Sequence, residues 1–471
     1  MVSLIILQFL FSGFVQKWYI PQGTNGPAGR VLIGDTDRDG NYEFIFTTYG
    51  GTYTIYFYEL HLPSTWEIDS VPYLYSPLLW DIGDFDLDGF YDLVMQSSWG
   101  PPSVGIAIFE SPDSFSYPTQ EVWRDTIGFP LVIPICVYDV DGDGVPEIVY
   151  GNGNGATDFN IFESAGDNSY ELIYTGYPPF SCASTFAFGD FDRDSSNEFV
   201  FGNTSGRYAV YECNGNNSYV EIITQQLSTL NVKDCFTVPD ADGDGKLEFV
   251  VKGFVVPTAR IHAFIFEATN DNTYEVIKSF DLFGGHNSYY GGYSEAGDVD
   301  GDNIPEIVLE GCQNIYIIKS AGNDSFYVWE TLPGNVSGSC VRVFDIDDNG
   351  LSEIVISGND ETRIYEYEEG GIEEITGKTQ VTRLEISPNP FIQTLYIKFQ
   401  TQAEKEINVR IYDVVGTLVK ALYRGFLSGH STLTWNGTDD NGRLVPQGIY
   451  FLRVEDLDSG ATSCKKVLKV R

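Results

Sequence analysis

Aspartate side chains recur at every second position in seven short segments, each ending in a further acidic residue, close to the pattern D-x-D-x-D-G-x-x-[DE]. Side-chain oxygens from positions 1, 3, 5 and 9 can converge with the position-7 carbonyl on one hard cation. Calcium accepts about six to eight oxygens at flexible geometry, whereas magnesium requires a stricter octahedron. Zinc prefers His or Cys ligands, which these segments lack. The pattern therefore predicts up to seven calcium ions per chain, one for each segment.

The predicted ligands are the residues at positions 1, 3, 5 and 9, together with several position-7 residues that offer a carbonyl oxygen. They are Asp35, Asp37, Asp39, Asn41 and Glu43; Asp84, Asp86, Asp88, Phe90 and Asp92; Asp139, Asp141, Asp143, Val145 and Glu147; Asp190, Asp192, Asp194 and Glu198; Asp240, Asp242, Asp244, Lys246 and Glu248; Asp298, Asp300, Asp302 and Glu306; and Asp345, Asp347, Asn349 and Glu353. The last acid leads directly into an apolar segment, with no exiting helix, which favours a static brace over a helix-opening sensor.

The seven segments are not equivalent. A glycine at position 6 permits the tight turn, but Ser195 and Asn303 replace it in the fourth and sixth segments, and Asn349 replaces an aspartate in the seventh. We expect these three sites to bind calcium more weakly, the fourth above all, because serine tolerates the left-handed conformation less well than asparagine. The alternative, that Asp and Gly only fill turns, does not require seven copies in phase.

The acidic segments recur with a period of 47 to 58 residues, measured between their first aspartates. Each period contains four short apolar or aromatic stretches separated by turns, which is typical of a propeller blade. A helical solenoid would show a period of about 3.6 residues, which is absent. We therefore expect an all-β chain with a seven-bladed β-propeller over residues 17–377. The stretch 15–20 resembles an outer strand, and we expect it to close the ring beside residues 371–376.

Composition excludes several classes of protein. The 471 residues include 67 acidic and 27 basic side chains, for a net charge of -40, so nucleic acid and anionic membranes are disfavoured partners. The 30 Tyr, 32 Phe and 7 Trp are enough for a large core, unlike a disordered acidic chain. The seven cysteines form no C-x-x-C pair, and we interpret them as small buried hydrophobes.

The N-terminal apolar run, residues 2–15, is too short to span a bilayer and suits the core of a truncated signal peptide over residues 1–16. The alternative is a buried strand. No other segment approaches transmembrane length, so no membrane span is expected.

The composition changes near residue 370, and we place a linker at 378–384 and a small β-sandwich at 385–471. Six alternating stretches predict its strands: TLYIKF, EINVRIYDVVG, LVKALY, STLTWNG, GIYFLRVED and SCKKVLKVR. Residues 439–442 are interpreted as a hairpin turn, because the D-x-D-x-D spacing is absent there.

The acidic repeats resemble the FG-GAP/VCBS class, found in integrin α-chain heads and in many secreted bacterial proteins, over residues 28–377. This resemblance implies a calcium-braced, seven-bladed propeller and leaves activity open. The C-terminal segment resembles the sorting domain of the type IX secretion system, which is similar to the Ig-like domain of flagellar hook-capping proteins. Its landmarks are Pro388 to Phe391, Ile411 to Asp413 with Gly416, Trp435 to Gly437, Asp440 to Gly442, Gly448 to Phe451, and Lys465 to Leu468.

The second resemblance implies a Gram-negative bacterium, with the type IX machinery as a partner. It also implies a location outside the cell or on the outer-membrane surface. The alternative is a structural Ig-like appendage without a sorting role.

No catalytic set stands out in the sequence. The four histidines share no motif, and G-x-S-x-G, H-E-x-x-H and P-loop patterns are absent. The insertion 283–295 offers His286, Tyr289, Tyr290 and Tyr293 as a binding lip suited to sugars; alternatively, the loop packs its own tyrosines.

We therefore expect a non-catalytic adhesion or ligand-binding module that recognises a glycan or a protein. The alternative is a polysaccharide lyase or hydrolase, for which His286 and Tyr290 would be the catalytic candidates. A third option is a structural component of the cell surface.

Overall fold

A computed structural model of the chain describes residues 13–21, 30–47, 54–61, 65–72, 77–97, 105–125, 134–151, 157–227, 231–255, 260–284, 292–311, 313–334, 340–358, 361–368, 381–413, 418–440, 442–456 and 462–470. All regular structure in these ranges is β-strand. The chain divides into two compact units. Phe14–Tyr367 forms one unit, and Glu368–Arg471 belongs to the other. The expectation of an all-β chain is confirmed.

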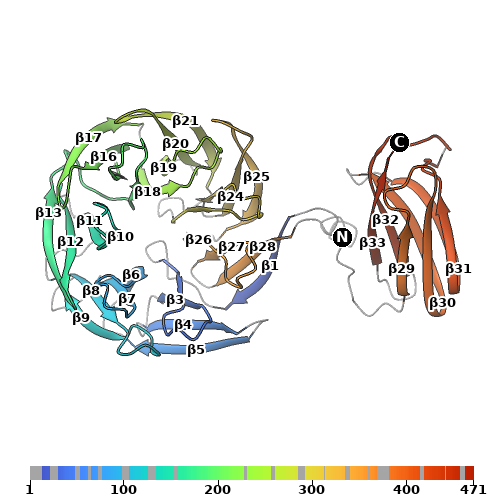
Figure 1. The fold of residues 1–471 in the computed structure, drawn as a ribbon, viewed down its shortest axis with the longest axis horizontal. Helices are drawn as coiled ribbons and strands as arrows, with labels where there is room; N and C mark the ends of the chain where they lie inside the picture. The colour runs from blue at the N-terminus through green and yellow to red at the C-terminus, as the bar shows by residue number, and fades with distance from the viewer. Residues whose placement is uncertain are drawn as a thin grey trace. The chain divides into compact units, whose positions relative to one another are not determined.

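Seven four-stranded sheets form the blades of a propeller, arranged in a ring with the first strand of each blade near the axis and the fourth at the rim (Figure 1). The first three blades contain β2 (Leu32–Gly34), β3 (Glu43–Thr47), β4 (Thr54–His61) and β5 (Thr65–Pro72); β6 (Pro77–Gly83), β7 (Asp92–Ser97), β8 (Gly105–Glu110) and β9 (Gln120–Arg124); and β10 (Ile135–Tyr138), β11 (Glu147–Gly151), β12 (Phe159–Gly166) and β13 (Ser169–Gly176).

The remaining blades contain β14 (Ala187–Gly189), β15 (Glu198–Gly202), β16 (Arg207–Cys213) and β17 (Tyr219–Gln226); β18 (Asn231–Val238), β19 (Glu248–Val255), β20 (Arg260–Asn270) and β21 (Thr273–Phe283); β22 (Glu295–Gly297), β23 (Glu306–Gly311), β24 (Asn314–Ser320) and β25 (Phe326–Pro333); and β26 (Cys340–Phe344), β27 (Glu353–Ser357), β28 (Thr362–Glu368) and β1 (Gly13–Ile20). The seven-bladed propeller predicted from the repeat is therefore confirmed.

Apolar and aromatic side chains fill the spaces between blades. The second strands β3, β11, β15 and β27 are buried along their whole length, because both faces of each blade pack against other side chains. Phe159 of the third blade, for example, meets Phe199, Phe201 and Tyr211 of the fourth blade in edge-to-face contacts. The aromatic residues noted in the composition thus provide much of the packing that holds one blade to the next.

Ring closure uses the N-terminal strand. β1 pairs with β28 and supplies the fourth strand of the seventh blade, so the ends of the propeller meet in one sheet. Phe14 packs on Trp329 of the sixth blade and on Tyr367, with ring centroids 5.6 and 5.4 Å apart. The backbone pairing of β1 with β28 thus holds the two ends of the propeller together.

The closure differs in detail from the sequence prediction. The expected partner, residues 371–376, lies outside the described ranges, and the described partner is β28, because the last blade needs only three strands from its own repeat. Residues 1–12 of the predicted leader also lie outside these ranges, whereas its last residues, from Gly13, belong to β1. β29 (Val381–Ser387) begins within the predicted linker 378–384.

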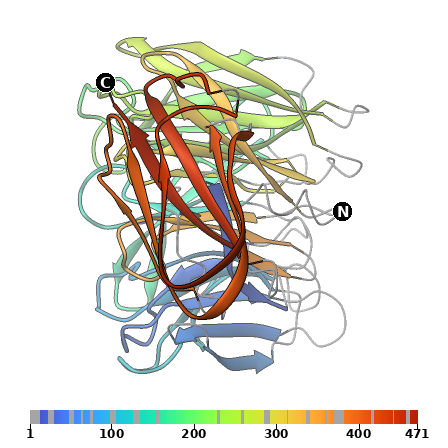
Figure 2. The same cartoon turned by 90° about the vertical axis from the view of Figure 1, so that its right-hand side faces the viewer.

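The C-terminal unit is a folded sheet of β29, β30 (Leu395–Asp413), β31 (Leu418–Trp435), β32 (Gly448–Asp456) and β33 (Thr462–Lys469), drawn in orange to red in Figure 2. β31 pairs along one edge of β30, whereas β29 and β32 pair with the two halves of its other edge. The prediction of six separate strands was wrong. A register shift between Thr401 and Lys405 carries β30 through the polar stretch without a turn, and β31 likewise joins two predicted strands.

The sequence landmarks of the C-terminal unit pack together in its core. Trp435 is fully buried between Phe391 and Tyr450, with ring centroids 5.3 Å from each. The Tyr450 hydroxyl donates to the Pro446 carbonyl at 2.8 Å, and the Asn389 side chain bonds to the backbone of β33. Widely separated motifs therefore stabilise one Ig-like core.

The turn predicted at 439–442 is confirmed by the bond from Gly442 N–H to the Asp439 carbonyl at 3.1 Å. Five of the seven cysteines, Cys136, Cys182, Cys213, Cys235 and Cys340, are buried as free thiols, as interpreted from the sequence. No helix long and apolar enough to cross a membrane occurs in the part of the chain that the structure describes.

Candidate metal centres

Each acidic segment connects the first strand of a blade to the second, and the acid at position 9 is the first residue of the second strand. We call these segments acidic loops one to seven; they comprise residues 35–43, 84–92, 139–147, 190–198, 240–248, 298–306 and 345–353. In an up-and-down blade, the turn between the third and fourth strands emerges on the same side as the acidic loop. β21 ends at Phe283 and β22 begins at Glu295, both on the opposite side.

The backbone of every acidic loop turns through two left-handed residues. Position 6 has positive φ in all seven loops, including Ser195 at 77° and Asn303 at 66°. Position 4 also has positive φ in each, from 55° at Asp348 to 82° at Gly243. Loops four and six therefore keep the turn, and Ser195 bears the steric strain that a side chain experiences in this conformation.

Hydrogen bonds within the loops repeat from blade to blade. In loop three, Asp139 accepts the N–H of Gly144 at 3.0 Å, and Asp143 accepts the N–H of Val145 at 2.9 Å. Glu147 uses only Oε2 to accept the N–H of Val140, at 2.6 Å. These backbone bonds direct the carboxylates toward the inside of the turn.

The position-9 acids are the most informative residues of the site. Each is at most 1% exposed and uses one carboxylate oxygen to accept the position-2 N–H. The other oxygen has no hydrogen-bond partner in six of the loops, at Glu43, Asp92, Glu147, Glu198, Glu248 and Glu353. In loop six, the corresponding oxygen of Glu306 lies 3.1 Å from the ammonium of Lys319. A buried carboxylate oxygen without a donor is costly, and a bound cation would compensate for it.

The remaining loop acids lie close to these orphan oxygens. In loops three, four and five, all four acids place an oxygen within 4.8 Å of the others, as do three acids in loops one and two. Without a cation, burial raises the pKa of every position-9 acid: to about 7 for Glu306, to about 9 for Glu198, and to about 8 for Glu43, Asp92, Glu147, Glu248 and Glu353. The donor set is purely oxygen and fits calcium.

The acidic loops also join neighbouring blades. In loops two to five, the position-3 aspartate accepts a backbone N–H from the turn between the third and fourth strands of the next blade. The bonds run from Asn168 to Asp86 (2.6 Å), Asn217 to Asp141 (2.7 Å), Asn272 to Asp192 (2.6 Å) and Asp324 to Asp242 (2.7 Å). All four donor residues have φ between 54° and 57°. Any cation held by these loops therefore lies at a junction between two blades.

The sequence analysis missed a further acid in the site. A glutamate on the third strand lies opposite the position-9 acid, where paired side chains share one face of the sheet about 5 Å apart. The six glutamates are Glu59, Glu110, Glu163, Glu212, Glu267 and Glu366. An aromatic residue followed by glutamate marks each position in the sequence. Variable hairpin lengths hide this motif when residues are counted from the acidic loop.

Lysines approach three of the loops in different ways. Lys319 of β24 contacts Asp300, Asp302 and Glu306 in loop six. Lys246, at position 7 of loop five, pairs with Glu267 and lies 3.3 Å from Asp244.

In the seventh blade, Lys17 lies 2.8 Å from Glu366, which also accepts a hydrogen bond from Asn349 at 3.0 Å. The side-chain Nδ2 of Asn349 therefore faces the third-strand glutamate, while its side-chain Oδ1 accepts the Leu351 N–H. The calcium occupancy of each loop, and the weaker calcium binding expected for loops four, six and seven, remain predictions.

The predicted binding lip is only partly described. His286, Tyr289 and Tyr290 lie outside the described residues. Tyr293 is only 7% exposed, which differs from an exposed lip, because it packs on Trp80 and beneath Arg30.

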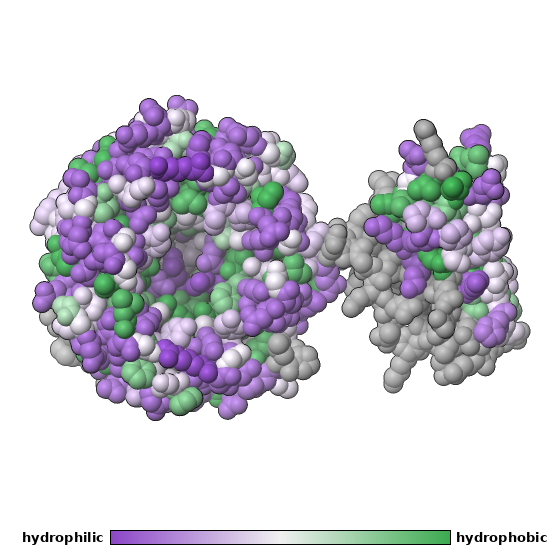
Figure 3. All heavy atoms as spheres, in the orientation of Figure 1, coloured by the Kyte–Doolittle hydropathy of each residue, from purple (hydrophilic) through white to green (hydrophobic). Residues whose placement is uncertain are grey.

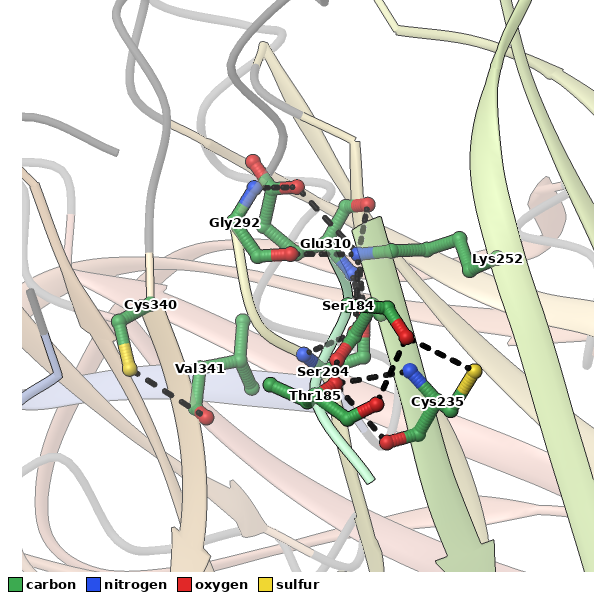
Figure 4. A network of polar contacts seen from close by, with 10 residues as sticks. Ser184, Thr185, Cys235, Lys252, Gly292, Ser294, Glu310, Cys340 and Val341 are labelled. Atoms are coloured by element: carbon green, nitrogen blue, oxygen red, sulfur yellow. Dashed lines mark hydrogen bonds and ion pairs between the residues drawn. The ribbon is translucent and has the colours of Figure 1, made fainter. Parts of the chain in front are cut away.

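The end of the same insertion is anchored by a buried ion-pair network (Figure 4). The ammonium of Lys252, which is completely buried, donates to the Gly292 carbonyl at 2.9 Å and to the Ser294 hydroxyl at 2.6 Å. Asp234 and Glu310 lie 3.3 and 3.5 Å from it. The network ties the segment before β22 to the fifth and sixth blades.

A cavity of about 240 Å³ lies between the first strands of the seven blades. Arg30, Arg342, Asp81, Glu295 and Tyr293 are among its lining residues. The space-filling view shows the centre of the ring hollowed, within a largely hydrophilic face (Figure 3).

Comparison with known proteins found one family that matches part of the chain and solved structures that are similar to it. A chain in the crystal structure of BBS1N in complex with ARL6DN, soaked with lead, is similar over 76% of this chain and 98% of that chain, with 12% identity and a TM-score of 0.49. No curated protein sequence matches. Residues 391–460 match the family described as FlgD Ig-like domain, which agrees with the Ig-like core around Trp435.

Proposed function

We propose that this protein is a calcium-braced propeller of the FG-GAP/VCBS type. In this proposal it is exported by a Gram-negative bacterium and acts as a non-catalytic adhesion or ligand-binding module. The observation that carries the calcium role recurs in six blades: a buried acid begins the second strand and leaves one oxygen without a hydrogen-bond donor. Acids placed in this way call for positive charge.

Calcium, when bound, supplies charge compensation to carboxylates that would otherwise repel one another. The chain's own residues place these carboxylates: the left-handed turn aims them inward, and backbone N–H groups fix one oxygen of several acids. The position-3 aspartates of loops two to five also hold the next blade. On this proposal, the metal sites stiffen the ring, and the protein needs no moving element to use them.

Ligand recognition is assigned to the side of the propeller opposite the acidic loops, where β21 ends and the first strands of the blades begin. Arg30 and Arg342 contribute guanidinium groups to the axial cavity, and Tyr293 contributes an aromatic ring. These groups suit a polar extracellular ligand such as a glycan or a protein side chain. The Lys252 network supports this role by holding the end of the insertion in place.

Export is assigned to the C-terminal unit. The match to the FlgD Ig-like domain and the clustering of the Phe391, Trp435 and Tyr450 motifs support a type IX sorting domain. Deleting residues 381–471 should keep the protein inside a bacterium that has this system, while the full chain reaches the medium or the outer surface. Export of the truncated chain at the full-length level would contradict the assignment.

A thermal melt in calcium and in excess EGTA, with metal analysis of the purified full chain, tests the calcium role. Each site contributes about 2.7 kcal/mol at a calcium concentration of 100 Kd, so chelation should lower the melting temperature by about 10 °C or more. Several calcium ions per chain are expected. A protein without bound calcium, whose melting is unchanged by EGTA, would refute it.

Binding and catalysis are separated by two assays on the same preparation. A glycan array should retain the full chain in calcium, whereas incubation with bound polysaccharides should release no reducing ends. Release of reducing ends would favour the lyase or hydrolase alternative.

A further inference from the structure

Loop six departs from the other loops at the third-strand position. The pairing of Ile307 with Ile318 places Lys319 opposite the buried Glu306, where the six other blades carry glutamate. A cation therefore replaces an anion at the point where the other loops concentrate negative charge. The Lys319 side chain faces the acidic loop. Lysine in place of glutamate at this position changes the local charge by two units.

The ammonium of Lys319 lies among the loop carboxylates. It forms a short hydrogen bond with Asp300, lies 2.8 Å from Asp302 Oδ2 and lies 3.1 Å from Glu306 Oε1. These residues are positions 3, 5 and 9 of the loop, which the sequence analysis assigned to calcium. The lysine side chain is 17% exposed and its ammonium lies 4.9 Å from the centre of the Trp329 ring. Trp329 thus packs over the ion pair and holds the side chain in place.

Loop five shows that a nearby lysine need not have this effect. Lys246 pairs with the third-strand Glu267 and with Asp244, whereas the buried Glu248 keeps its orphan oxygen. Lys246 is also more exposed than Lys319, at 31%. Lys319 differs because its ammonium approaches the orphan oxygen of the position-9 acid itself.

The ring topology also distinguishes loop six from loops two to five. Loops two to five receive an N–H group at position 3 from the third-to-fourth-strand turn of the next blade. The seventh blade has no such turn, because β1 supplies its fourth strand. Asp300 therefore lacks the donor that Asp86, Asp141, Asp192 and Asp242 receive, and it bonds to Lys319 instead.

We propose that Lys319 is a built-in counter-ion that takes the place of calcium in loop six, so the chain binds at most six calcium ions. The inference rests on the proposed calcium role of the other loops. With Lys319 as the counter-ion, the junction between the sixth and seventh blades, beside the point of ring closure, does not depend on calcium. Chelation would then loosen the other junctions first.

The test counts calcium ions per folded chain at saturating calcium, by equilibrium dialysis and metal analysis of full-length variants. Lys319→Glu restores the residue found in the other six blades and should add one ion to the wild-type number. The reciprocal variant Glu212→Lys, in the fourth blade, should remove one ion. Lys278→Glu, on the rim strand β21, changes the net charge as Lys319→Glu does and should leave the number unchanged.

Lys319→Met provides a second variant in case Lys319→Glu fails to fold, because it removes the charge without adding a carboxylate. It should also gain one ion, and EGTA should lower its melting temperature more than that of the wild type. Seven ions in the wild type, or no gain in a folded Lys319 variant, would overturn the inference while leaving the calcium role intact. No calcium in any variant would instead refute the proposed function.

Discussion

The carboxylate at position 9 of loop three combines two features that ordinary turn acids lack. Glu147 is completely buried, and only one of its oxygens has a hydrogen-bond donor. Burial raises its pKa to about 8, so in calcium-free protein at neutral pH this acid holds a proton much of the time. A glutamine at this position would mimic the protonated acid but could not serve as a charged ligand.

Glu147→Gln should therefore lower the calcium number by one and lower the melting temperature in calcium. In EGTA its melting temperature should stay within about 2 °C of the wild type, since a 1 kcal/mol change shifts melting by about 2–4 °C in a large domain. Glu171→Gln, an exposed residue on the same blade, is the control and should change neither value. A large loss in EGTA would show that Glu147 acts in packing alone.

Ser195 tests the strain in the loop backbone. Its φ of 77° costs a residue with a side chain about 1–2 kcal/mol. Glycine avoids this steric cost, but it offsets part of the gain because it loses more conformational entropy on folding. Ser195→Gly should therefore stabilise the protein by about 0.5–1 kcal/mol in urea unfolding at saturating calcium. The reverse change in loop three, Gly144→Ser, should destabilise by a similar amount. A destabilised Ser195→Gly would contradict the assigned strain.

At the scale of elements, β1 determines whether the ring closes. Ile20 is fully buried in the core cluster that includes residues of the first two blades, whereas Val15 on the same strand is 38% exposed. Ile20→Ala should cost about 2–5 kcal/mol of unfolding free energy, and Val15→Ala well under half of that. Equal, small losses in urea unfolding would mean that β1 does not dock as described.

For the molecule as a whole, proton and calcium binding should compete in every blade whose loop holds calcium. The position-9 acids have folded-state pKa values of about 7 to 9 without calcium, against about 4.3 when unfolded. These groups therefore stabilise the calcium-free fold below about pH 4, and that contribution is lost as the pH rises through their folded-state values. Calcium requires the deprotonated acids, so its contribution should grow over the same range.

We therefore expect the difference in melting temperature between calcium and EGTA to be larger at about pH 8.5 than at about pH 6.5. Calorimetric titration at neutral pH should also detect proton release on calcium binding, as a dependence of the heat on the buffer used. A difference that shrinks as the pH rises would contradict this linkage.

Sequence patterns alone predicted the number of blades, the position of the acidic loops and the start of the Ig-like pattern in the C-terminal unit. These features depend on local information: a pattern close to D-x-D-x-D-G repeats in every blade, and the acid at position 9 always begins a strand. Even Ser195 and Asn303 keep the left-handed turn, because the surrounding hydrogen bonds specify it. The repeat therefore predicted the architecture, although it does not show which blades are in contact.

The tertiary structure decided the relationships between distant segments. The pairing of β1 with β28 and the N–H bonds between neighbouring blades depend on ring closure, which no local motif encodes. An aromatic residue followed by glutamate marks the third-strand glutamates in the sequence, but only the sheet register shows which loop acid each one faces. Lys319 shows the physical reason most clearly: its sequence neighbourhood is an ordinary strand, and only folding places its ammonium among Asp300, Asp302 and Glu306. Likewise, only the folded ring shows that Tyr293 is buried and does not form part of an exposed lip.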